Sequence, residues 1–270
     1  MLRGKRRMAE KKPIIIALCG KGGVGKTSLS ALIVRILCEQ KPDAKILAID
    51  ADPAVGLASA LGVEVSSTVD DIRTAFIESV EEGAEETALE MLGDAKFEMM
   101  QALVERKDLS FLAIGRPESA GCYCKVNAYL KEIISMIADH FDYVVIDGEA
   151  GIEQVNRRVM EKVTHLILVS DASKKGLKVV KTIHEVAQKL VMYESDGLII
   201  NRIPDLSLCE EIDAGDLRVL AMIPDDHQMS ANDMRGNTVF ELPDTAPVYQ
   251  GAEEALYQIG ILRKEGKRNP

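Results

Sequence analysis

Residues 20–27, GKGGVGKT, have the types and spacing of a phosphate-binding loop. They follow an apolar run and precede an amphipathic stretch, and such a loop requires this strand–loop–helix setting. Glycines allow backbone N–H groups to curl around phosphate oxygens, and the helix that follows adds the positive end of its dipole. We expect Lys26 to reach the β- and γ-phosphates of a nucleotide and the Thr27 hydroxyl to bind Mg²⁺. The predicted nucleotide-binding loop comprises Gly20, Lys21, Gly22, Gly23, Val24, Gly25, Lys26, Thr27 and Ser28.

Two cysteines near the middle of the chain could bind a metal ion. Cys122 and Cys124 end the segment RPESAGCYC, residues 116–124. Two thiolates are half of the four ligands that structural zinc takes and that nickel often takes. A pair of ordinary buried thiols is the alternative, and a disulfide is disfavoured because a C-x-C ring is strained. The remaining cysteines fit structural positions: Cys19, Cys38 and Cys209.

The elements that must position these residues are short apolar runs that alternate with amphipathic stretches. Near-continuous apolar strands between helices predict an α/β fold, with a mostly parallel sheet flanked by helices on both faces. The expected strands are Ile14–Cys19, Ile46–Ile49, Leu109–Ile114, Tyr143–Ile146, His165–Val169, Gly197–Ile200 and Leu217–Ile223. The expected helices are Thr27–Gln40, Asn127–His140, Lys174–Tyr193 and Ala252–Lys264.

Length and charge limit the classes of protein to which this chain can belong. Its 270 residues suit one large domain, which we place at residues 13–264, with an acidic helical excursion around 66–106. A basic N-terminal tail, 1–12, and a C-terminal tail, 265–270, flank this domain. A formal net charge of −10 disfavours nucleic-acid binding, and no apolar run is long enough to span a bilayer. We therefore expect a cytoplasmic protein with reduced thiols that binds neither nucleic acid nor membrane.

Polar residues directly follow several of the expected strands. Asp50 and Asp52 follow the second run, Asp147 follows the fourth, and Asn201 with Arg202 follows the sixth. Ligands of open α/β sheets bind at the carboxyl ends of the strands, so these side chains are candidates for a single site. Taken one by one, Asp52 could instead be a helix cap and Asn201 a turn residue.

The early lysine of the loop, Lys21, makes the motif resemble the deviant phosphate loop of the MinD/ParA/nitrogenase-iron-protein superfamily. The resemblance implies that Lys21 reaches the nucleotide of a second subunit, so that ATP lies between the two chains of a homodimer. It also implies that Asp52 orients the attacking water and that Asp50 approaches the Mg²⁺ shell. Asp147 and Gly151 resemble the second switch, whose glycine amide senses the γ-phosphate.

The same resemblance supplies roles for the residues that surround the base. Asn201 is expected to read adenine, and Arg202 accompanies it after the sixth strand. Pro224 and Asp225 resemble the segment that flanks the base. The chain is thus expected to be a Mg²⁺-dependent ATP hydrolase that binds ATP and ADP. Its expected catalytic residues are Lys21, Lys26 and Asp52.

RPESAGCYC and the switch VVIDGEAGIE at residues 144–153 together resemble the nickel-insertion ATPases of the CooC type, which mature carbon monoxide dehydrogenase. The related ATPase that serves acetyl-CoA synthase shares the pattern, and the likeness covers about residues 13–260. It implies a metallochaperone that dimerises with nucleotide and carries Ni²⁺ to an apo-metalloenzyme client. A two-fold dimer places Cys122 and Cys124 beside their copies, so that four sulfurs hold one Ni²⁺ or Zn²⁺.

Two other functions stay open at this point. A MinD/ParA-like spatial regulator would use an amphipathic C-terminal anchor, but Leu256–Lys264 is better interpreted as a core-packing helix. An ATP-dependent iron–sulfur reductase would bridge its subunits with a cluster, and the C-x-C spacing counts against it. Residues 50–53, which resemble the first switch of the superfamily, continue as AVGLA at residues 54–58, where the better-known nickel-insertion members have a polar run. The client could therefore be carbon monoxide dehydrogenase, acetyl-CoA synthase or another metalloenzyme.

Overall fold

The computed structural model describes residues 12–52, 54–81, 96–115, 124–148, 159 and 162–263. Its strands are β1 (Ile14–Gly20), β2 (Ile46–Asp50), β3 (Val104–Glu105), β4 (Ser110–Ala113), β5 (Tyr143–Asp147), β6 (Lys162–Ser170), β7 (Met192–Ile203) and β8 (Val219–Pro224). Its helices are α1 (Lys26–Gln40), α2 (Gly56–Leu61), α3 (Val69–Glu81), α5 (Cys124–Ala138), α7 (Lys174–Leu190), α8 (His227–Met234) and α9 (Pro247–Gln258). Two 3₁₀ turns are η1 (Leu206–Glu211) and η2 (Val239–Glu241), and residues 96–102 are also helical.

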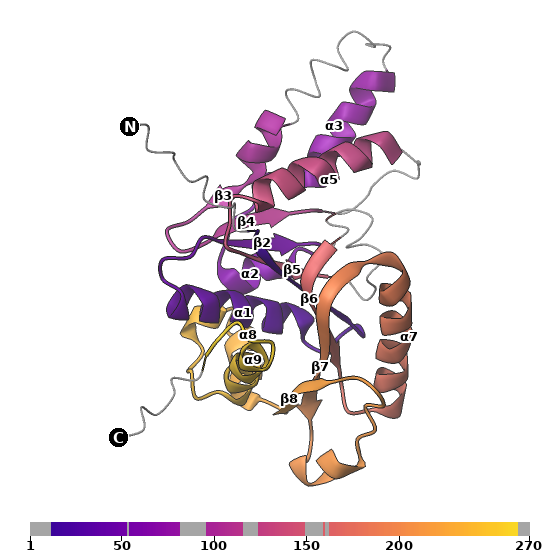
Figure 1. Cartoon of the computed structure of the whole chain (residues 1–270). Helices are drawn as coiled ribbons and strands as arrows, with labels where there is room; N and C mark the ends of the chain where they lie inside the picture. The colour runs from indigo at the N-terminus through magenta and orange to yellow at the C-terminus, as the bar shows by residue number, and fades with distance from the viewer. Residues whose placement is uncertain are drawn as a thin grey trace, which may run out of the picture.

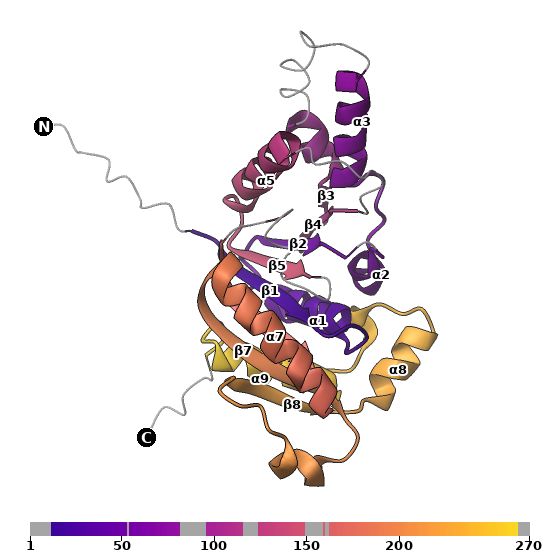
Figure 2. The same cartoon turned by 90° about the vertical axis from the view of Figure 1, so that its right-hand side faces the viewer.

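The strands of the described residues form one sheet in the order β3-β4-β2-β5-β1-β6-β7-β8. Every pair is parallel except β3 with β4, which is antiparallel. Figure 1 shows helices on both sides of this sheet, and Figures 1 and 2 both show α3 and α5 lying together at its β3–β4 end. The predicted α/β fold with a mostly parallel sheet is confirmed.

The central strand β1 shows why both faces of the sheet are apolar. Ile16 and Leu18 point to the face covered by α1, α2 and α9, while Ala17 and Cys19 point to the face covered by α3, α5 and α7. All four are fully buried. Burial of a large aliphatic side chain stabilises a fold by about 1.5–3 kcal/mol, so a strand that is apolar at every position belongs inside such a sandwich.

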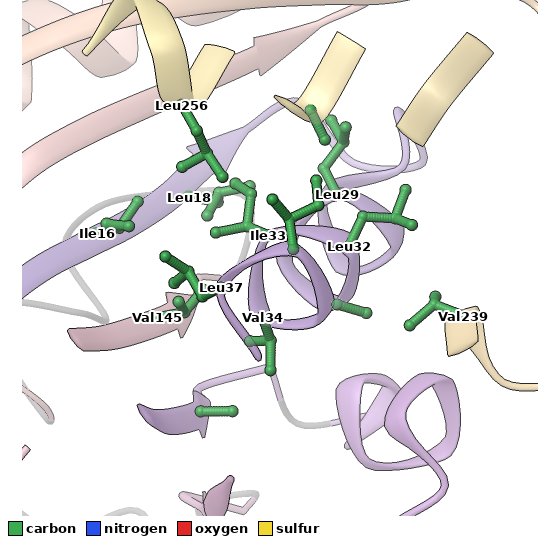
Figure 3. Packing of buried hydrophobic residues seen from close by; sticks show 14 of the residues in the cluster. Ile16, Leu18, Leu29, Leu32, Ile33, Val34, Leu37, Val145, Val239 and Leu256 are labelled. Carbon is green, nitrogen blue, oxygen red and sulfur yellow. The ribbon is translucent and has the colours of Figure 1, made fainter. Parts of the chain in front are cut away.

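Helix α1 is buried on nearly all sides. Every residue from Leu29 to Leu37 is buried, because the helix packs on the sheet and also contacts α2 and α9. Figure 3 shows Leu29 and Ile33 of this helix close to Leu18 of β1. The element that follows the phosphate loop is therefore held firmly in the core.

All seven predicted strands are present, and the differences lie at the edges. The segment expected to be helical around 66–106 contains α3 and the helix 96–102, but its end forms the edge strand β3 instead. Strand β7 begins at Met192 because it pairs with β6 from Lys162 onward, so the predicted helix Lys174–Tyr193 stops at Leu190. Helices α2 and α8 were not predicted, since both are short.

The prediction for the last helix was wrong in its bounds. It was expected at Ala252–Lys264, whereas α9 spans Pro247–Gln258. Proline is well suited to the first turn of a helix, and Gly260, with φ of 79°, lies just beyond the end. Leu256 is fully buried against the core, as a core-packing helix requires.

The ends of the chain add little to this description. The predicted tails 1–12 and 265–270 lie outside the described residues, apart from Lys12. Within the part of the chain that is described, no helix combines the length and the apolar character needed to cross a membrane.

Candidate nucleotide-binding site

The predicted phosphate loop connects β1 to α1 at the carboxyl edge of the sheet. Gly20 has φ of 151°, and a Cβ at this position would overlap the carbonyl oxygen of Val169. Gly25 has φ of 91°, and a Cβ there would lie 2.8 Å from the Nδ2 atom of Asn201. L side chains are strained in this part of backbone space, so the shape of the loop depends on glycine.

Lys26 closes the loop on itself. Its side chain is largely buried, and its Nζ donates a hydrogen bond to the carbonyl oxygen of Lys21 at 3.2 Å. Val24 is buried and anchors the loop, while Gly22 and Gly23 are exposed with open space around them. Thr27 and Ser28 are half-buried in the first turn of α1. The exposed backbone of the loop and the N-terminus of a buried helix together form an anion-binding cradle.

Lys21 forms an ion pair within its own chain. Its Nζ lies 2.5 Å from the Oδ2 atom of Asp171, and both side chains are about 30% exposed. Asp171 directly follows β6 and also accepts hydrogen bonds from the Ser173 hydroxyl, at 2.6 Å, and the Ser173 backbone N–H. Partial burial raises the pKa of Asp171, but the hydrogen bonds from Lys21 and Ser173 outweigh it and the net shift is downward.

Asp171 is a residue of this edge that the sequence analysis missed. The signal was available, because Asp171 follows the fifth expected strand just as the other candidates follow theirs. Ser30 was also missed. It lies one turn into α1, and its hydroxyl contacts a candidate carboxylate at the end of β5.

That carboxylate is Asp147, which is fully buried. Its Oδ1 accepts a hydrogen bond from the Ser30 hydroxyl at 2.9 Å, and its Oδ2 has no partner among the described residues. Burial raises the pKa of Asp147 to about 6, although the hydroxyls of Thr27 and Ser30 and the charge of Lys26 act in the opposite direction. A buried acceptor without a partner is costly, so this oxygen points to a ligand.

The oxygen donors at this point suit Mg²⁺. A carboxylate oxygen of Asp147 and the hydroxyl of Thr27 are hard ligands of the kind that this ion prefers. Mg²⁺ keeps several waters and usually takes only one or two protein ligands beside phosphate, so a small donor set is sufficient.

Asp50 lies beside Asp147 in the sheet register, at the end of β2. Its Oδ1 accepts from the backbone N–H of Asp52 at 3.1 Å, and its Oδ2 accepts from that of Leu57 at 2.8 Å. Burial raises the pKa of Asp50 to about 7, and the neighbouring charge of Asp147 adds to this rise. Asp50 therefore holds the segment that leads into α2.

The segment after Asp50 lies next to the phosphate loop. Asp52 is half-buried, and its Oδ1 accepts from the backbone N–H of Ala54 at 2.9 Å, which forms a local turn. Val55 has φ of 50°, an unfavourable value for a β-branched residue. A Cβ on Gly56 would contact the Thr27 methyl group at 3.4 Å, so this segment packs against the loop.

Asn201 and Arg202 connect the end of β7 to the phosphate loop. The Asn201 Nδ2 donates to the carbonyl oxygen of Val24 at 2.8 Å, and an Arg202 Nη donates to that of Gly23 at 2.9 Å. Asn201 is buried, whereas Arg202 is exposed and has φ of 57°. Both side chains thus support the backbone of the loop.

Pro224 and Asp225 lie at the end of β8, beside the end of β7. The backbone N–H of Asp225 donates to the carbonyl oxygen of Ile203 at 2.9 Å. The next residue, Asp226, caps α8 through Gln228 and Met229, and its second oxygen accepts from the backbone N–H of Val248 in α9. One carboxylate therefore joins the starts of both C-terminal helices.

The predicted cysteine site falls largely outside the described residues. Cys122 is not among them, and neither is Gly151 of the predicted second switch. Cys124 is the first residue of α5, a helix that was expected to start at Asn127. Where side chains are described, no three His, Cys, Asp or Glu residues are grouped as a metal site. Cys19, Cys38 and Cys209 form no disulfide bond among the described residues, and burial raises the pKa of Cys38 to about 12.

Comparisons with known proteins agree with this arrangement. Residues 12–200 match the family described as AAA domain. The chain is 36% identical over 250 residues to an uncharacterized ATP-binding protein of Methanocaldococcus jannaschii, and the match covers 91% of this chain and 98% of that one. Its structure is similar to that of the septum site-determining protein MinD complexed with Mg-ADP from Pyrococcus horikoshii, with a TM-score of 0.66, 22% identity and coverage of 92% and 96%.

The chain therefore belongs to the AAA domain family, and its fold is that of the MinD proteins. Another relative is the carbon monoxide dehydrogenase accessory protein CooC of Rhodospirillum rubrum. That protein is 28% identical over 272 residues, which cover 93% of this chain and 97% of CooC.

Proposed function

We propose that this protein is an ATP-hydrolysing metallochaperone that dimerises with nucleotide and delivers Ni²⁺ to an apo-metalloenzyme. The observation that carries the proposal is the similarity to CooC along almost its whole length, combined with the C-x-C pair in RPESAGCYC. Carbon monoxide dehydrogenase and acetyl-CoA synthase are the candidate clients. Both parts of the proposal depend on the same dimer, because each chain contributes half of the metal site.

The nucleotide half of the proposal uses the carboxyl edge of the sheet. The loop N–H groups and Lys26 bind the phosphates, while Thr27 and Asp147 would hold Mg²⁺, which neutralises phosphate charge when bound. Asp50 holds the backbone of Asp52 and of Leu57, at the start of α2, through its two hydrogen bonds. Asp52 is assigned to orient the attacking water. Asn201 and Pro224–Asp225 are assigned to the adenine side.

Lys21 has a competing partner in this scheme. To reach the nucleotide of a second subunit, its Nζ must leave Asp171, with which it is paired at 2.5 Å. In an isolated chain, Lys21 thus stays paired with Asp171. Dimerisation with ATP replaces this carboxylate with the nucleotide of the second subunit. We infer that the ion pair weakly favours the monomer.

The metal half of the proposal uses the thiolates of Cys122 and Cys124 from both chains. Four sulfurs suit Ni²⁺ or Zn²⁺, and the ion is cargo that must be released to the client. A nucleotide can drive release only if metal affinity differs between the ADP and ATP states. The γ-phosphate acts on both switch segments, so we expect this difference to be present.

A metal titration tests the proposal. Ni²⁺ is titrated into the wild type and into Cys122→Ser/Cys124→Ser, each without nucleotide, with ADP and with a non-hydrolysable ATP analogue. We expect the double variant to lose one Ni²⁺ per dimer, while the control Cys38→Ser/Cys209→Ser keeps it. An unchanged Ni²⁺ stoichiometry in the first variant would refute the proposed metal site. Equal Ni²⁺ affinity with ADP and with the ATP analogue would refute the coupling between nucleotide and metal.

The two rival functions make different predictions. A spatial regulator of the MinD type would bind vesicles with ATP, yet Leu256, Ile261 and Leu262, which the anchor would need, are buried in the core. An iron–sulfur reductase would be brown when purified without oxygen. Co-sedimentation with vesicles or a brown anaerobic sample would replace the proposed function with the corresponding rival.

A further inference from the structure

A cavity of about 460 Å³ lies at the amino edge of the sheet, away from the phosphate loop. Its walls include the residues that precede β2 and β4, whose other ends reach the nucleotide edge. The helix 96–102 and the C-terminal half of α5 complete it. The volume falls in the range of roughly 300–1,000 Å³ that is typical of small-molecule sites.

The floor of the cavity is apolar. Ile46 and Leu109 come from the strand starts, and Ile133 comes from α5; all three are buried. Met100 and Met136 lie at the mouth, where they are 58% and 43% exposed. Methionine is flexible and polarizable, so it adapts to irregular apolar ligands. The cavity thus presents a poorly hydrated apolar surface that can bind the apolar part of a ligand.

The charges around the cavity are opposite in sign to those of the whole chain. Four basic side chains line it, Lys45, Lys96, Arg106 and Lys107, against the two acidic ones of Glu105 and Asp108. The chain as a whole has a formal net charge of −10. A local excess of cations beside an apolar floor is complementary to a ligand with an anionic head and an apolar body.

Three of these cations are available to a ligand. The Arg106 guanidinium is held by the carbonyl oxygens of Leu61 and Gly62, at 2.9 and 3.1 Å. The three lysines are exposed, and none forms an ion pair with any other described residue. Lys45 and Lys107 precede the strands, across the cavity from α5, so the head of a ligand would lie there and its body against the helix.

We propose that this cavity binds a small amphipathic anion, with an aliphatic or aromatic body and a carboxylate, sulfonate or phosphate head. The site is separate from the nucleotide edge, because the parallel strands β2 and β4 place their starts and ends at opposite edges of the sheet. Its occupation therefore needs no nucleotide. The apolar floor supplies most of the affinity, and the lysines select the charge of the head.

Titration of the full-length protein with 8-anilino-1-naphthalenesulfonate, which combines an aromatic body with a sulfonate, tests the site. We expect saturable fluorescence enhancement with a stoichiometry of one, in the presence of saturating ADP as well as in its absence. Met136→Glu should weaken binding by about tenfold or more, because it places a carboxylate at the apolar mouth. Lys45→Gln/Lys107→Gln should weaken it by about fivefold, in line with exposed charge interactions.

Matched controls separate the cavity from other surfaces. Met192→Glu replaces another exposed methionine on β7, and Lys178→Gln/Lys189→Gln removes two exposed lysines of α7; both should bind as the wild type does. Thermal unfolding verifies that each variant folds, and Met100→Glu carries the same expectation should Met136→Glu be unfolded. Competitive displacement by ADP would overturn the proposal, as would equal affinity for the uncharged N-phenyl-1-naphthylamine, non-saturable binding, or no effect of the glutamate at the mouth.

Discussion

The ends of β2 and β5 carry the same residue in the same register, and the structure uses the two copies differently. Asp50 and Asp147 are sheet neighbours, and both are fully buried. Asp50 accepts a backbone N–H with each oxygen, whereas Asp147 accepts the Ser30 hydroxyl with its Oδ1 and leaves its Oδ2 without a partner among the described residues. One carboxylate holds its own chain, and the other has an oxygen left for a ligand.

The difference arises from the backbone that follows each strand. After β2 the chain turns back, so that the N–H groups of Asp52 and Leu57 point at Asp50, and the start of α2 is capped from the strand. After β5 the next N–H, that of Gly148, donates to the carbonyl oxygen of Leu18 in β1 instead. The position after a strand therefore makes a residue a candidate, and the local supply of donors decides its role.

Asp147→Asn gives the largest expected effect on this comparison. We expect MgATP hydrolysis to fall by about 100-fold or more, the magnitude typical of a lost charge-stabilising group. The free energy of unfolding without nucleotide should stay the same or rise, because the substitution removes a buried charge with an unsatisfied oxygen. Steady-state ATPase assays and urea unfolding measure the two quantities, with the exposed Asp233→Asn as control. A marked loss of stability would mean that Asp147 is a structural residue.

Asp50→Asn should destabilise the protein, in contrast to Asp147→Asn, and lower the free energy of unfolding by about 1–3 kcal/mol. The amide keeps only one acceptor and turns an NH₂ group toward a backbone N–H, so a buried donor loses its partner. Urea unfolding of the nucleotide-free protein measures the change. If Asp50→Asn were as stable as the wild type, the capping role of this carboxylate would be refuted.

The free energy of unfolding should depend on pH through the titration of both Asp50 and Asp147. Burial raises the pKa of Asp50 to about 7 and that of Asp147 to about 6, so between about pH 4 and 7 the native state binds more protons than the unfolded state. The free energy of unfolding should therefore fall as pH rises through this window, by at most about 1.4 kcal/mol per pH unit for each proton in excess.

Urea midpoints at pH 5, 6, 7 and 8, with a chelator and without nucleotide, provide the measurement. Asp147→Asn should keep the part of the slope that belongs to Asp50 and lose the rest. A free energy of unfolding that rises with pH over this range would contradict the assigned burial of the pair.

Asp171→Asn has the smallest expected effect and concerns the opposite side of the phosphate loop. On the proposed dimer, it frees Lys21 from its intrachain partner, so the dimer with an ATP analogue should tighten by about 1.5- to 5-fold, as expected for a partly exposed ion pair. Analytical ultracentrifugation measures the dissociation constant. Asp213→Asn, which removes the exposed contact with Lys181, is the control. A weaker dimer would show that Asp171 supports the interface instead of opposing it.

Much of the fold was predictable because its signals are local. Seven strands appear as apolar runs, and the phosphate loop carries its glycines in one short segment. Some errors ignored a local signal, as with Pro247, which marks the true start of α9. Others had none to use: β3 has two residues and exists only because it pairs with β4.

Several residues that the structure places at the carboxyl edge of the sheet were expected from the sequence, but Asp171 and Ser30 were missed and the contacts could not be predicted. Asp50, Asp147 and Asn201 were all found from their positions after strands. Lys21 meets a partner 150 residues away, and Asn201 meets one 177 residues away, so no spacing rule connects them. These pairs depend on the strand order, which no local pattern specifies.

The sequence by itself determined a phosphate loop, a parallel sheet and a set of polar residues at strand ends, because glycine, apolar runs and turn positions act over a few residues. Only the tertiary structure decided that Asp50 accepts hydrogen bonds from its own backbone, that Lys21 pairs with Asp171, and where an apolar cavity lined by basic side chains lies. Those properties depend on which groups meet after the strands have assembled, and burial then sets the cost of each unsatisfied charge.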